Sequence, residues 1–503
     1  MPLYSRSSPI SKLSIELLCM IFSATRELDE RNSRTWDSNV LLSHVCQSWR
    51  HLAIQYAPLW DELIWSPANS VDLALTVLER SKSAPLRIDI DAMACLHKPP
   101  PSSDHVASAH SVIRTALSHL SRMAVCALSW SDDYWDSDVF APLFSPLNLP
   151  HLRELVLRYQ SRAVLPPPLP VVQVVCDDLL QLHLQDVVVK NWASMLGETT
   201  SIVTLTNCDI EYDDFLLFLE STPDLVELHL GWMDILNAPR DSDKVVGNAM
   251  DSLKVSHLEL DTLRIIGRLL PIDKIDNVEL AAHYMEEDQR PLWLDFLRIP
   301  SIAKIARLHL YHDVQSVLSV IAPNSMRRTL TSTRSALPLL PAALDGLDMF
   351  STLEMVALDI TQWVDFMDLV AAAPAGPRMP TLQDIRLAVN QSDISPTTAS
   401  LRDYTGPVIA FPRLSSLDIG LLGPDPPSEA LVRCLLRAVQ PLFLIHGSGS
   451  DEAALKVQVM GSHDHSDALR CMYEKFVEGG ATPGELKVGQ VILLGLVLYE
   501  NVL

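Results

Sequence analysis

The sequence predicts an α/β fold in which a small helical module is followed by a long series of strands, each joined to the next by a helix or an irregular return. Three observations carry this prediction. The chain has 503 residues, enough for roughly two to four compact domains or one long repeat array. Apolar residues recur at helical spacing near the N-terminus, and a six-residue apolar pattern recurs beyond residue 151.

Composition narrows the class of protein. The 62 acidic and 39 basic residues give a formal net charge of −23, which argues against nucleic acid as the main partner. The eight cysteines are dispersed without a C-x-x-C pair, as expected for reduced thiols of an intracellular protein. The strongest apolar run, VILLGLVLY at 491–499, is about half the length needed to cross a bilayer. We therefore expect a soluble chain of the cytoplasm or nucleus with no membrane partner.

Two amphipathic helices are expected at the N-terminus. In LSIELLCMIFSAT, Ser14 can cap a helix that has Glu16 in its first turn. A second helix is predicted over VLLSHVCQSWRHLAIQYA and ends at Pro58. The tryptophans of this region are expected to pack, because a large ring stabilises only where it is covered; they are Trp49, Trp60 and Trp65.

These residues resemble the F-box, in particular the F-box-like variant common in fungal proteins. Three blocks carry the resemblance: LSIELL with Ile-Phe at 13–22, SHVCQSWRHLA at 43–53, and PLW at 58–60. It covers residues 9–66, and the usual proline after the first leucine is Ser14 here. The resemblance implies docking to a Skp-family adaptor and, through it, to a cullin scaffold and a RING ubiquitin ligase. The implied adaptor-binding residues are Leu13, Ile15, Glu16, Leu17, Ile21, Phe22, Leu41, Val45, Trp49, Arg50, Leu52, Pro58, Leu59 and Trp60.

The alternative for the three tryptophans is that they are ordinary core of a helical cap. Beyond them, residues 67–150 are expected to hold linking helices and the first atypical repeats, and residues 1–8 a tail. NSVDLALTVLERSKSAP and VASAHSVIRTALSHLSRM have helical spacing, and LRIDIDAM alternates as a strand does.

A pattern of the form apolar-x-x-apolar-x-apolar recurs from residue 152 onward. It occurs in LRELVL, LLQLHL and LVELHL, and in weaker copies such as VSHLEL, IARLHL and LQDIRL, mostly 20 to 32 residues apart. This spacing is the leucine-rich-repeat signature, in which short strands stack over a continuous core. Residues 151–503 are therefore expected to form a degenerate repeat solenoid with parallel strands on its concave side, helices or irregular segments on its convex side and a C-terminal cap. A doubly wound α/β domain is the alternative.

The residues between the repeated leucines are expected to point to solvent on the concave face and to bind a protein substrate. His183, His229 and His309 share one repeat position there, where they either tune binding near neutral pH or are simply tolerated. The whole expected strip consists of Arg153, Glu154, Gln181, His183, Glu227, His229, Arg307, His309, Gln383, Asp384 and Arg386.

Catalytic motifs are missing from the sequence. No phosphate-binding loop, dinucleotide fingerprint, H-E-x-x-H or G-x-S-x-G occurs, and HGSGSDE at 446–452 has unsuitable glycine spacing. SHDHSD at 462–467 is interpreted as a surface loop rather than a metal site. DDYWDSD at 132–138 could either grip a basic peptide or be solvated. We expect no catalytic residue, no metal and no cofactor.

The combined prediction is a receptor that performs no chemistry and recruits an unknown protein substrate to a ubiquitin ligase, where proximity drives the reaction. A repeat scaffold whose helical part only caps the array is the first alternative. A hydrolase or transferase of the α/β class is the second, and the missing motifs argue against it.

Overall fold

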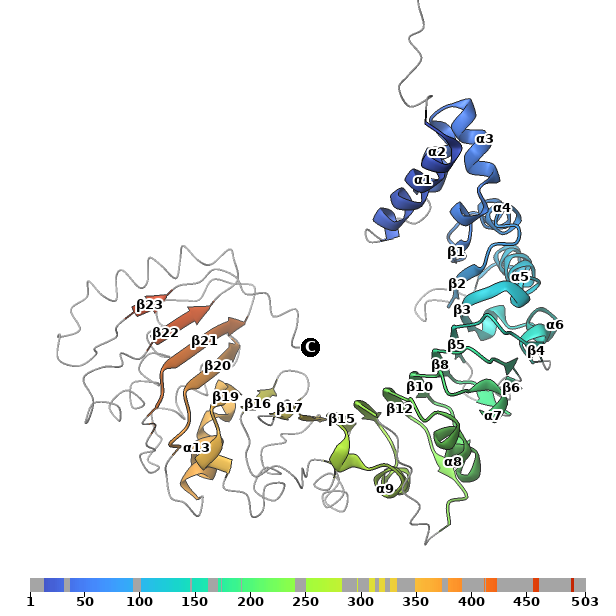
Figure 1. The fold of residues 1–503 in the computed structure, drawn as a ribbon. Helices are drawn as coiled ribbons and strands as arrows, with labels where there is room; N and C mark the ends of the chain where they lie inside the picture. The colour runs from blue at the N-terminus through green and yellow to red at the C-terminus, as the bar shows by residue number, and fades with distance from the viewer. Residues whose placement is uncertain are drawn as a thin grey trace, which may run out of the picture. The chain divides into compact units, whose positions relative to one another are not determined.

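The computed structural model describes residues 13–30, 37–93, 101–144, 147–161, 171–172, 174–190, 192–239, 250–282, 296, 307–312, 316–321, 326–332, 349–372, 379–390, 411, 413–422, 456–460 and 490–492. The chain divides into two units. Unit 1 comprises Met1–Met250 with Arg268–Leu270, and unit 2 comprises Asp251–Gly267 with Pro271–Leu503. Each is a mixed α/β structure with a mostly parallel sheet (Figure 1).

Unit 1 begins with three helices, α1 (Ile15–Glu30), α2 (Asp37–His44) and α3 (Gln47–Gln55). α1 starts directly after Ser14, whose hydroxyl accepts the amide of Leu17 at 3.4 Å, as predicted. The single second helix that the sequence predicted is wrong, because the chain is extended at Cys46 and divides it into α2 and α3. The Cys46 sulfur accepts the Trp49 amide at 3.5 Å and so caps α3.

The core of these helices is aromatic. Phe22 of α1 meets Trp49 of α3 edge to face, with ring centroids 5.1 Å apart. Trp60, which follows the short 3₁₀ turn Ala57–Leu59, is buried and donates from Nε1 to the Ala53 carbonyl at 2.6 Å. The guanidinium of Arg80 lies 4.6 Å over its ring. Both tryptophans therefore join separate segments into one packed unit.

The main sheet of unit 1 is parallel, and its strands pair in chain order. Alternate side chains of neighbouring strands fall into two buried rows. One row contains Leu63, Leu155, Leu182 and Leu228, and the other contains their neighbours two residues later. The strands are β1 (Glu62–Trp65), β2 (Leu86–Ala92), β3 (Met123–Ser131), β5 (Glu154–Gln160), β8 (Gln181–Gln185), β10 (Ile202–Thr206) and β12 (Glu227–Gly231).

These rows extend the six-residue pattern beyond its predicted copies. In register with the later strands, Trp60-x-x-Leu63-x-Trp65 and Met123-x-x-Cys126-x-Leu128 have the same spacing. Another copy of the pattern lies in the long interval between Leu179 and Leu225; Thr200 takes its first apolar position, and Val203 and Leu205 of β10 take the other two. The pattern thus begins inside the segment that the sequence assigned to the helical module.

The segments that connect consecutive strands of the main sheet in unit 1 contain helices and short strand pairs. Figure 1 shows the longer helices on one side of the main strands. The helices are α4 (Val71–Arg80), α5 (Ser103–Leu117), α6 (Ser137–Phe140), α7 (Trp192–Met195) and α8 (Tyr212–Ser221). The short pairs are β4 (Leu147–Asn148) with β7 (Val174–Val175), β6 (Val171–Val172) with β9 (Val188–Val189), and β11 (Ile210–Glu211) with β13 (Ile235–Leu236).

Unit 2 departs from uniform parallel pairing. β14 pairs with β15 and β15 with β18, but β17 runs antiparallel between β18 and β16; the parallel order then continues from β16 through β19 to β23. The expectation of parallel strands throughout is therefore wrong for β17. The strands are β14 (Ser252–Ser256), β15 (Asn277–Ala282), β16 (Arg307–His312), β17 (Ser316–Ile321), β18 (Arg327–Ser332), β19 (Met355–Asp359), β20 (Asp384–Asn390), β21 (Ser416–Leu422), β22 (Lys456–Met460) and β23 (Gln490–Ile492), with helices α9 (Leu260–Leu269), α12 (Met349–Thr352) and α13 (Trp363–Ala371).

One predicted copy of the six-residue pattern does not match the register of the strands. In β14 the buried residues are Leu253 and Val255, which pair with Val278 and Leu280 of β15. The predicted copy VSHLEL starts at Val255 instead, and its last residue, Leu260, is the first of α9. The correct frame begins at Met250, because M-D-S-L-K-V has the same apolar spacing.

A buried arginine lies in the apolar row of unit 2. Arg328 of β18 pairs with Val278 of β15 and Val320 of β17, and it has no exposed surface. Its guanidinium donates to the carbonyls of Ile272 and Asp276, each at 3.0 Å. Burial lowers its pKa to about 10.

None of the helices in the described ranges combines the length and apolar character needed to cross a membrane.

Candidate functional site

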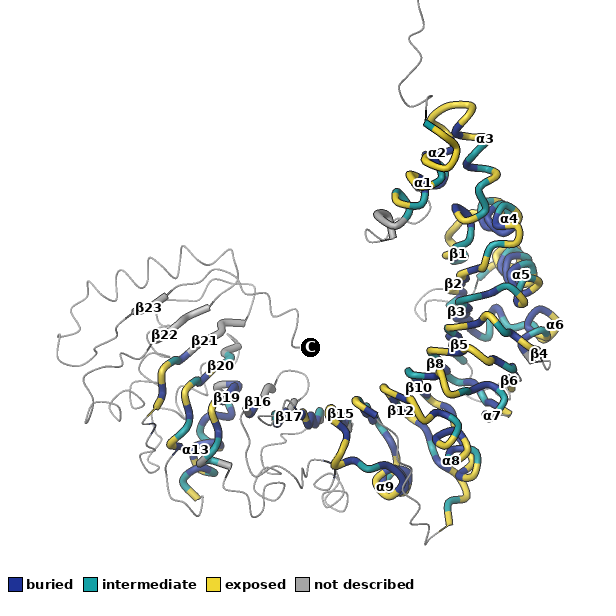
Figure 2. The backbone as a smooth tube through the Cα atoms, viewed as in Figure 1, coloured by how far each residue is buried: buried dark blue, intermediate teal, exposed yellow. Residues whose placement is uncertain are grey.

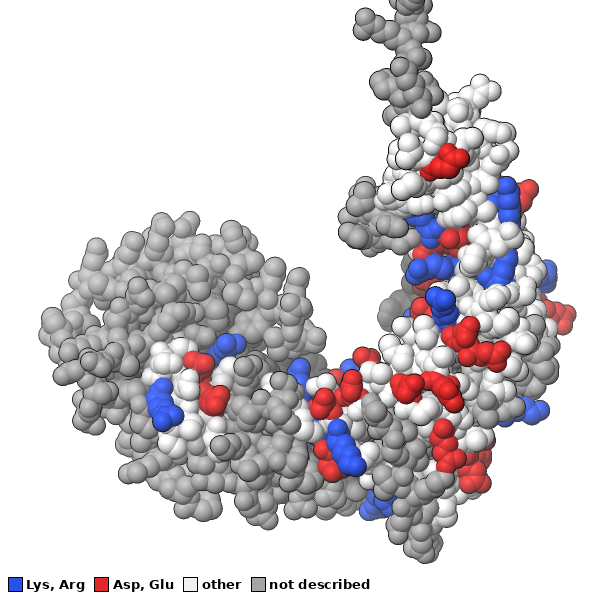
Figure 3. All heavy atoms as spheres, in the orientation of Figure 1, with Lys and Arg blue, Asp and Glu red and all other residues white. Residues whose placement is uncertain are grey.

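The N-terminal helices carry large apolar side chains that the chain itself leaves uncovered. We call these six residues the apolar face: Ile15, Leu17, Met20 and Ile21 of α1, Leu41 of α2, and Val45 directly after α2, which are 39 to 67% exposed. α1 and α2 pack against each other. Figure 2 shows exposed stretches along both helices, and Figure 3 shows little charge on the side of this region turned to the viewer. Grouped exposed apolar residues mark interaction sites.

α1 is apolar on two sides. Leu18 and Phe22 are buried against the rest of the chain. Leu17, Met20, Ile21 and Ala24 are exposed, and their spacing of three, four and seven residues places them on one stripe of the helix. A helix that docks into a groove presents anchors at this spacing. Met20 and Ala24 were missing from the predicted site, although their distance from Leu17 was a signal for them.

The predicted adaptor-binding residues divide into three groups by exposure. Ile15, Glu16, Leu17, Ile21, Leu41, Val45, Arg50 and Pro58 are exposed, and Leu13 and Leu52 are partly exposed. Four residues lie in the core, where aromatic and leucine packing covers them: Phe22, Trp49, Leu59 and Trp60. The alternative that Trp49 and Trp60 are core residues agrees with their burial, and Trp65 is buried as well.

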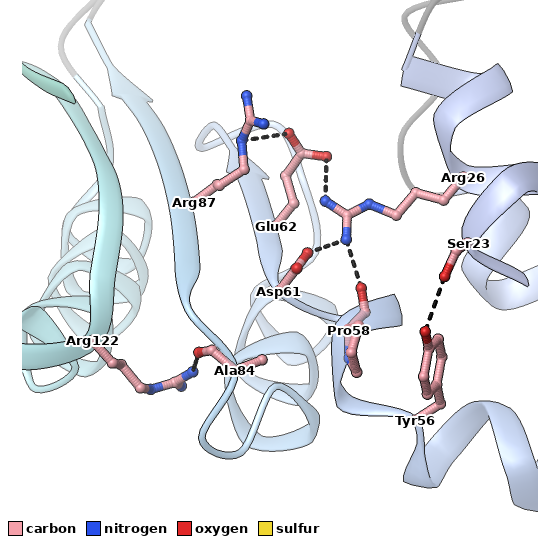
Figure 4. A network of polar contacts seen from close by, with 9 residues as sticks. All are labelled: Ser23, Arg26, Tyr56, Pro58, Asp61, Glu62, Ala84, Arg87 and Arg122. Atoms are coloured by element: carbon pink, nitrogen blue, oxygen red, sulfur yellow. Dashed lines mark hydrogen bonds and ion pairs between the residues drawn. The ribbon is translucent and has the colours of Figure 1, made fainter. Parts of the chain in front are cut away.

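A polar network joins α1 to the first strands (Figure 4). Arg26 of α1 donates to the Pro58 carbonyl at 2.6 Å, forms an ion pair with Asp61, and lies 3.6 Å from Glu62 of β1. Glu62 in turn lies 3.9 Å from Nε of Arg87 on β2. Ser23 and Tyr56 share a hydrogen bond of 3.0 Å beside this network. Because one guanidinium contacts three residues within the segment from Pro58 to the first residue of β1, it holds α1 against the start of the sheet.

The predicted polar strip is divided between the two units. In unit 1, Arg153 and Glu227 are exposed, and Glu154, Gln181, His183 and His229 are partly exposed at solvent-facing positions of their strands. In unit 2, Gln383 and Arg386 are exposed and Asp384 is partly exposed. The side chains of Arg307 and His309 lie outside the described residues.

The histidines of the strip do not lie on neighbouring strands. His183 of β8 pairs with Thr204 of β10, and Thr204 pairs with His229 of β12. Since strands are about 4.8 Å apart, the two histidines are separated by about 10 Å. Partial burial lowers the pKa of His183, opposed by nearby Glu154. The neutral form of His183 is therefore favoured, and tuning of binding by the histidines stays a prediction.

Carboxylates on β2 extend the strip beyond the predicted residues. Asp89 and Asp91 are exposed on β2, and Arg158 is exposed on β5. Partial burial raises the pKa of Asp89, and the charges of Asp91 and Glu154 raise it further, whereas Arg158 lowers it. The alternation in LRIDIDA was the signal that could have identified both aspartates.

The acidic and aromatic segment DDYWDSD is occupied by internal contacts. Asp132 accepts hydrogen bonds from Tyr159, whose pKa is raised by burial and by this bond, and from Ser161 at 2.9 Å. Trp135 stacks on Phe140 at 5.3 Å between centroids, and Asp136 caps α6 by accepting two of its amides. These contacts anchor the end of β3, while Asp138 of the same segment is exposed, and binding of a basic peptide by the segment stays a prediction.

The described part of the chain contains no group of three or more His, Cys, Asp or Glu side chains that could hold a metal ion. Five described cysteines are free thiols, and burial raises the pKa of Cys126, Cys176 and Cys208 to about 12, which makes them weak nucleophiles. SHDHSD and HGSGSDE lie outside the described residues.

Neither a protein-family model nor a curated protein sequence matches this chain.

Proposed function

We propose that this chain is a substrate-recruiting F-box receptor subunit of a cullin-RING (SCF-type) ubiquitin ligase. Its N-terminal helices would bind a Skp-family adaptor, and the solvent-facing side of its strands would bind a protein substrate. The strands would belong to a degenerate leucine-rich-repeat solenoid. In this role the chain is not an enzyme, because it supplies only proximity to the assembled ligase. It would act in the cytoplasm or nucleus.

The apolar face is the observation that carries the proposal. Leu17, Met20 and Ile21 form a stripe that the chain leaves exposed, although burying each such side chain would stabilise the protein by roughly 1.5–3 kcal/mol. A partner with an apolar groove would recover that free energy on binding. The face contains five of the residues that the F-box resemblance assigned to adaptor binding: Ile15, Leu17, Ile21, Leu41 and Val45.

The register of the strands supports the repeat interpretation. The buried rows of unit 1 align successive copies of one six-residue pattern without a shift between β3 and β12. Stacked repeats bury a shared core in this way.

Co-purification with a recombinant Skp-family adaptor tests the proposal. The double variant Leu17→Asp/Leu41→Asp places two charges on the apolar face, and we expect it to lose adaptor binding because those charges would be buried in the interface. The matched control is Leu217→Asp/Leu236→Asp, which alters leucines of 39% and 40% exposure on α8 and β13. The control should bind the adaptor as the unchanged chain does.

Unchanged adaptor binding by the folded Leu17→Asp/Leu41→Asp variant would exclude docking through this face. Trp49→Ala is unsuitable for this test, because Trp49 packs on Phe22 and its removal would disturb the helices themselves.

A repeat scaffold without a ligase role is the second candidate. The contacts of Arg26 and the burial of Trp60 favour it, because they show that the helices also cover the start of the sheet. Failure of the unchanged chain to bind any Skp-family adaptor would support the scaffold.

A further inference from the structure

We propose that the charged side chains on the outward face of β2, β3 and β5 bind a lysine- or arginine-rich segment of the protein that this chain recruits. The inference rests on the proposed receptor function and names the chemical class of its substrate. Four features of the described residues support it: the strand register, the sizes of the side chains, the charges and the electrostatic cost of those charges in the free chain.

The register places the short outward side chains of β3 between charged side chains of β2 and β5, with Val156 between the two charged residues of β5. Ala127 of β3 pairs with Asp89 of β2 on one side and with Val156 of β5 on the other. Adjacent strands are about 4.8 Å apart, so side chains on β2 and β5 are about 10 Å apart across β3. The aliphatic stem of a lysine or arginine can lie along the short side chains of β3 with its charged end beside a carboxylate. The outward residues of β3 are Val125, Ala127 and Ser129.

The charged side chains that flank β3 are mainly acidic. Asp89 and Asp91 lie on the β2 side and Glu154 lies on the β5 side. Arg158 is on the same face of β5 as Glu154, four residues further along, where Ser129 separates it from Asp91. Within the described ranges, none of the three carboxylates is within 4.0 Å of a basic side chain; the nearby Arg87 instead contacts Glu62. The three carboxylates outnumber the two exposed arginines of this face, Arg87 and Arg158, so its net charge is negative and favours a cationic segment over an acidic one or a nucleic acid.

These charges oppose folding of the free chain. Partial burial of Asp89 and the like charges of Asp91 and Glu154 all disfavour its ionised form. Natural chains retain residues that reduce stability where function requires them. A bound ammonium or guanidinium group would offset the repulsion, so the face is better suited to a cationic complex than to the free state.

Binding of a synthetic oligolysine peptide to the full-length chain tests the inference, with an oligoglutamate peptide of equal length as the anionic comparison. The triple variant Asp89→Asn/Asp91→Asn/Glu154→Gln removes three carboxylates from the face while keeping side-chain size. We expect it to weaken oligolysine binding by about tenfold and to reduce the salt dependence of binding. Oligoglutamate should bind neither protein.

The matched control removes the same number of charges elsewhere. Asp72→Asn/Asp104→Asn/Asp138→Asn alters exposed carboxylates on α4, α5 and α6 and should change the affinity for oligolysine by less than about twofold. An equal loss of oligolysine affinity in both triple variants would show that the peptide is attracted by the overall negative charge of the chain, and this would overturn the inference. Unchanged oligolysine affinity of the Asp89→Asn/Asp91→Asn/Glu154→Gln variant would overturn the inference as well.

Adaptor co-purification, measured on the same proteins, separates this inference from the proposed function. The Asp89→Asn/Asp91→Asn/Glu154→Gln variant should retain adaptor binding, because it changes no residue of the apolar face on the N-terminal helices. Loss of oligolysine binding together with retained adaptor binding supports both proposals. If the unchanged chain binds oligolysine through this face but binds no adaptor, the receptor function fails while the basic-segment site remains.

Discussion

The hydroxyl of Thr200 donates a hydrogen bond of 2.9 Å to the carbonyl of Leu179, at a position where other copies of the pattern have an apolar residue. Thr200 has no exposed surface, and its oxygen also accepts the amide of Gly197 at 3.4 Å. A small polar residue is tolerated in this core because the backbone of two segments satisfies it.

We expect Thr200→Val to reduce the free energy of unfolding by about 0.5–1.5 kcal/mol, because the valine keeps the shape but removes one hydrogen bond, while the Leu179 carbonyl keeps the Thr199 hydroxyl at 3.2 Å as a donor. Thr204→Val is the control: Thr204 lies on β10, the strand that follows Thr200, and points toward solvent. Chemical denaturation of both variants measures the difference. Equal stability of the two proteins would mean that the Thr200 hydrogen bond contributes nothing.

Thr200 also shows where sequence reasoning succeeded and where it stopped. Leucine spacing was sufficient to predict the strands around Leu155, Leu182 and Leu228, because buried positions alternate along a strand. The strand after Thr200 was missed, since its first apolar position is polar and its partner is a carbonyl that leaves no trace in the sequence.

For the candidate sites, too, residue spacing predicted one part and missed another. Spacing alone predicted an apolar stripe on α1, yet it could not distinguish exposed Leu17 from buried Phe22, because both sides of the helix are apolar. Only the packing of Phe22 against Trp49 decides which side is covered. The antiparallel β17 was likewise not predictable, because strand direction depends on pairing between segments that are distant in the chain.

Arg26 should stabilise α1 against local unfolding. Its side chain is 12% exposed and contacts Asp61 and Glu62, which are 23% and 16% exposed, so Arg26→Ala would leave two partly buried carboxylates without this cation. We expect a loss of about 1–3 kcal/mol in local stability, seen as faster amide hydrogen exchange throughout α1. Arg114→Ala, at an exposed position of α5, is the control and should leave exchange in α1 unchanged. Unaltered exchange in the Arg26 variant would contradict this role.

Asp89 should make stability depend on pH in a defined direction. Its folded-state pKa lies above the ordinary value of 3.8. Between these values the folded chain binds more protons than the unfolded chain, so the free energy of unfolding rises as the pH falls through the folded pKa. We therefore expect Asp89→Asn to be more stable than the unchanged chain at neutral pH, with an advantage that shrinks as the pH falls. Thermal melts across acidic and neutral pH measure this, with Asp72→Asn as the charge control.

The buried guanidinium of Arg328 leads to the last prediction. Its three carbonyl acceptors include those of Ile272 and Asp276, which also accept backbone amides, from Ile275 at 3.4 Å and from Arg327 at 2.7 Å. Removing the guanidinium therefore leaves these two carbonyls bonded, while it eliminates the cost of burying a charge.

We expect Arg328→Met, which has a similar length, to equal or exceed the stability of the unchanged chain. Arg328→Ala should instead lose about 2–5 kcal/mol, because it leaves a cavity beside Val278 and Val320. Denaturant unfolding of the two variants checks the order. If the methionine variant were as unstable as the alanine variant, the hydrogen bonds of Arg328 rather than its volume would hold β18 in the sheet.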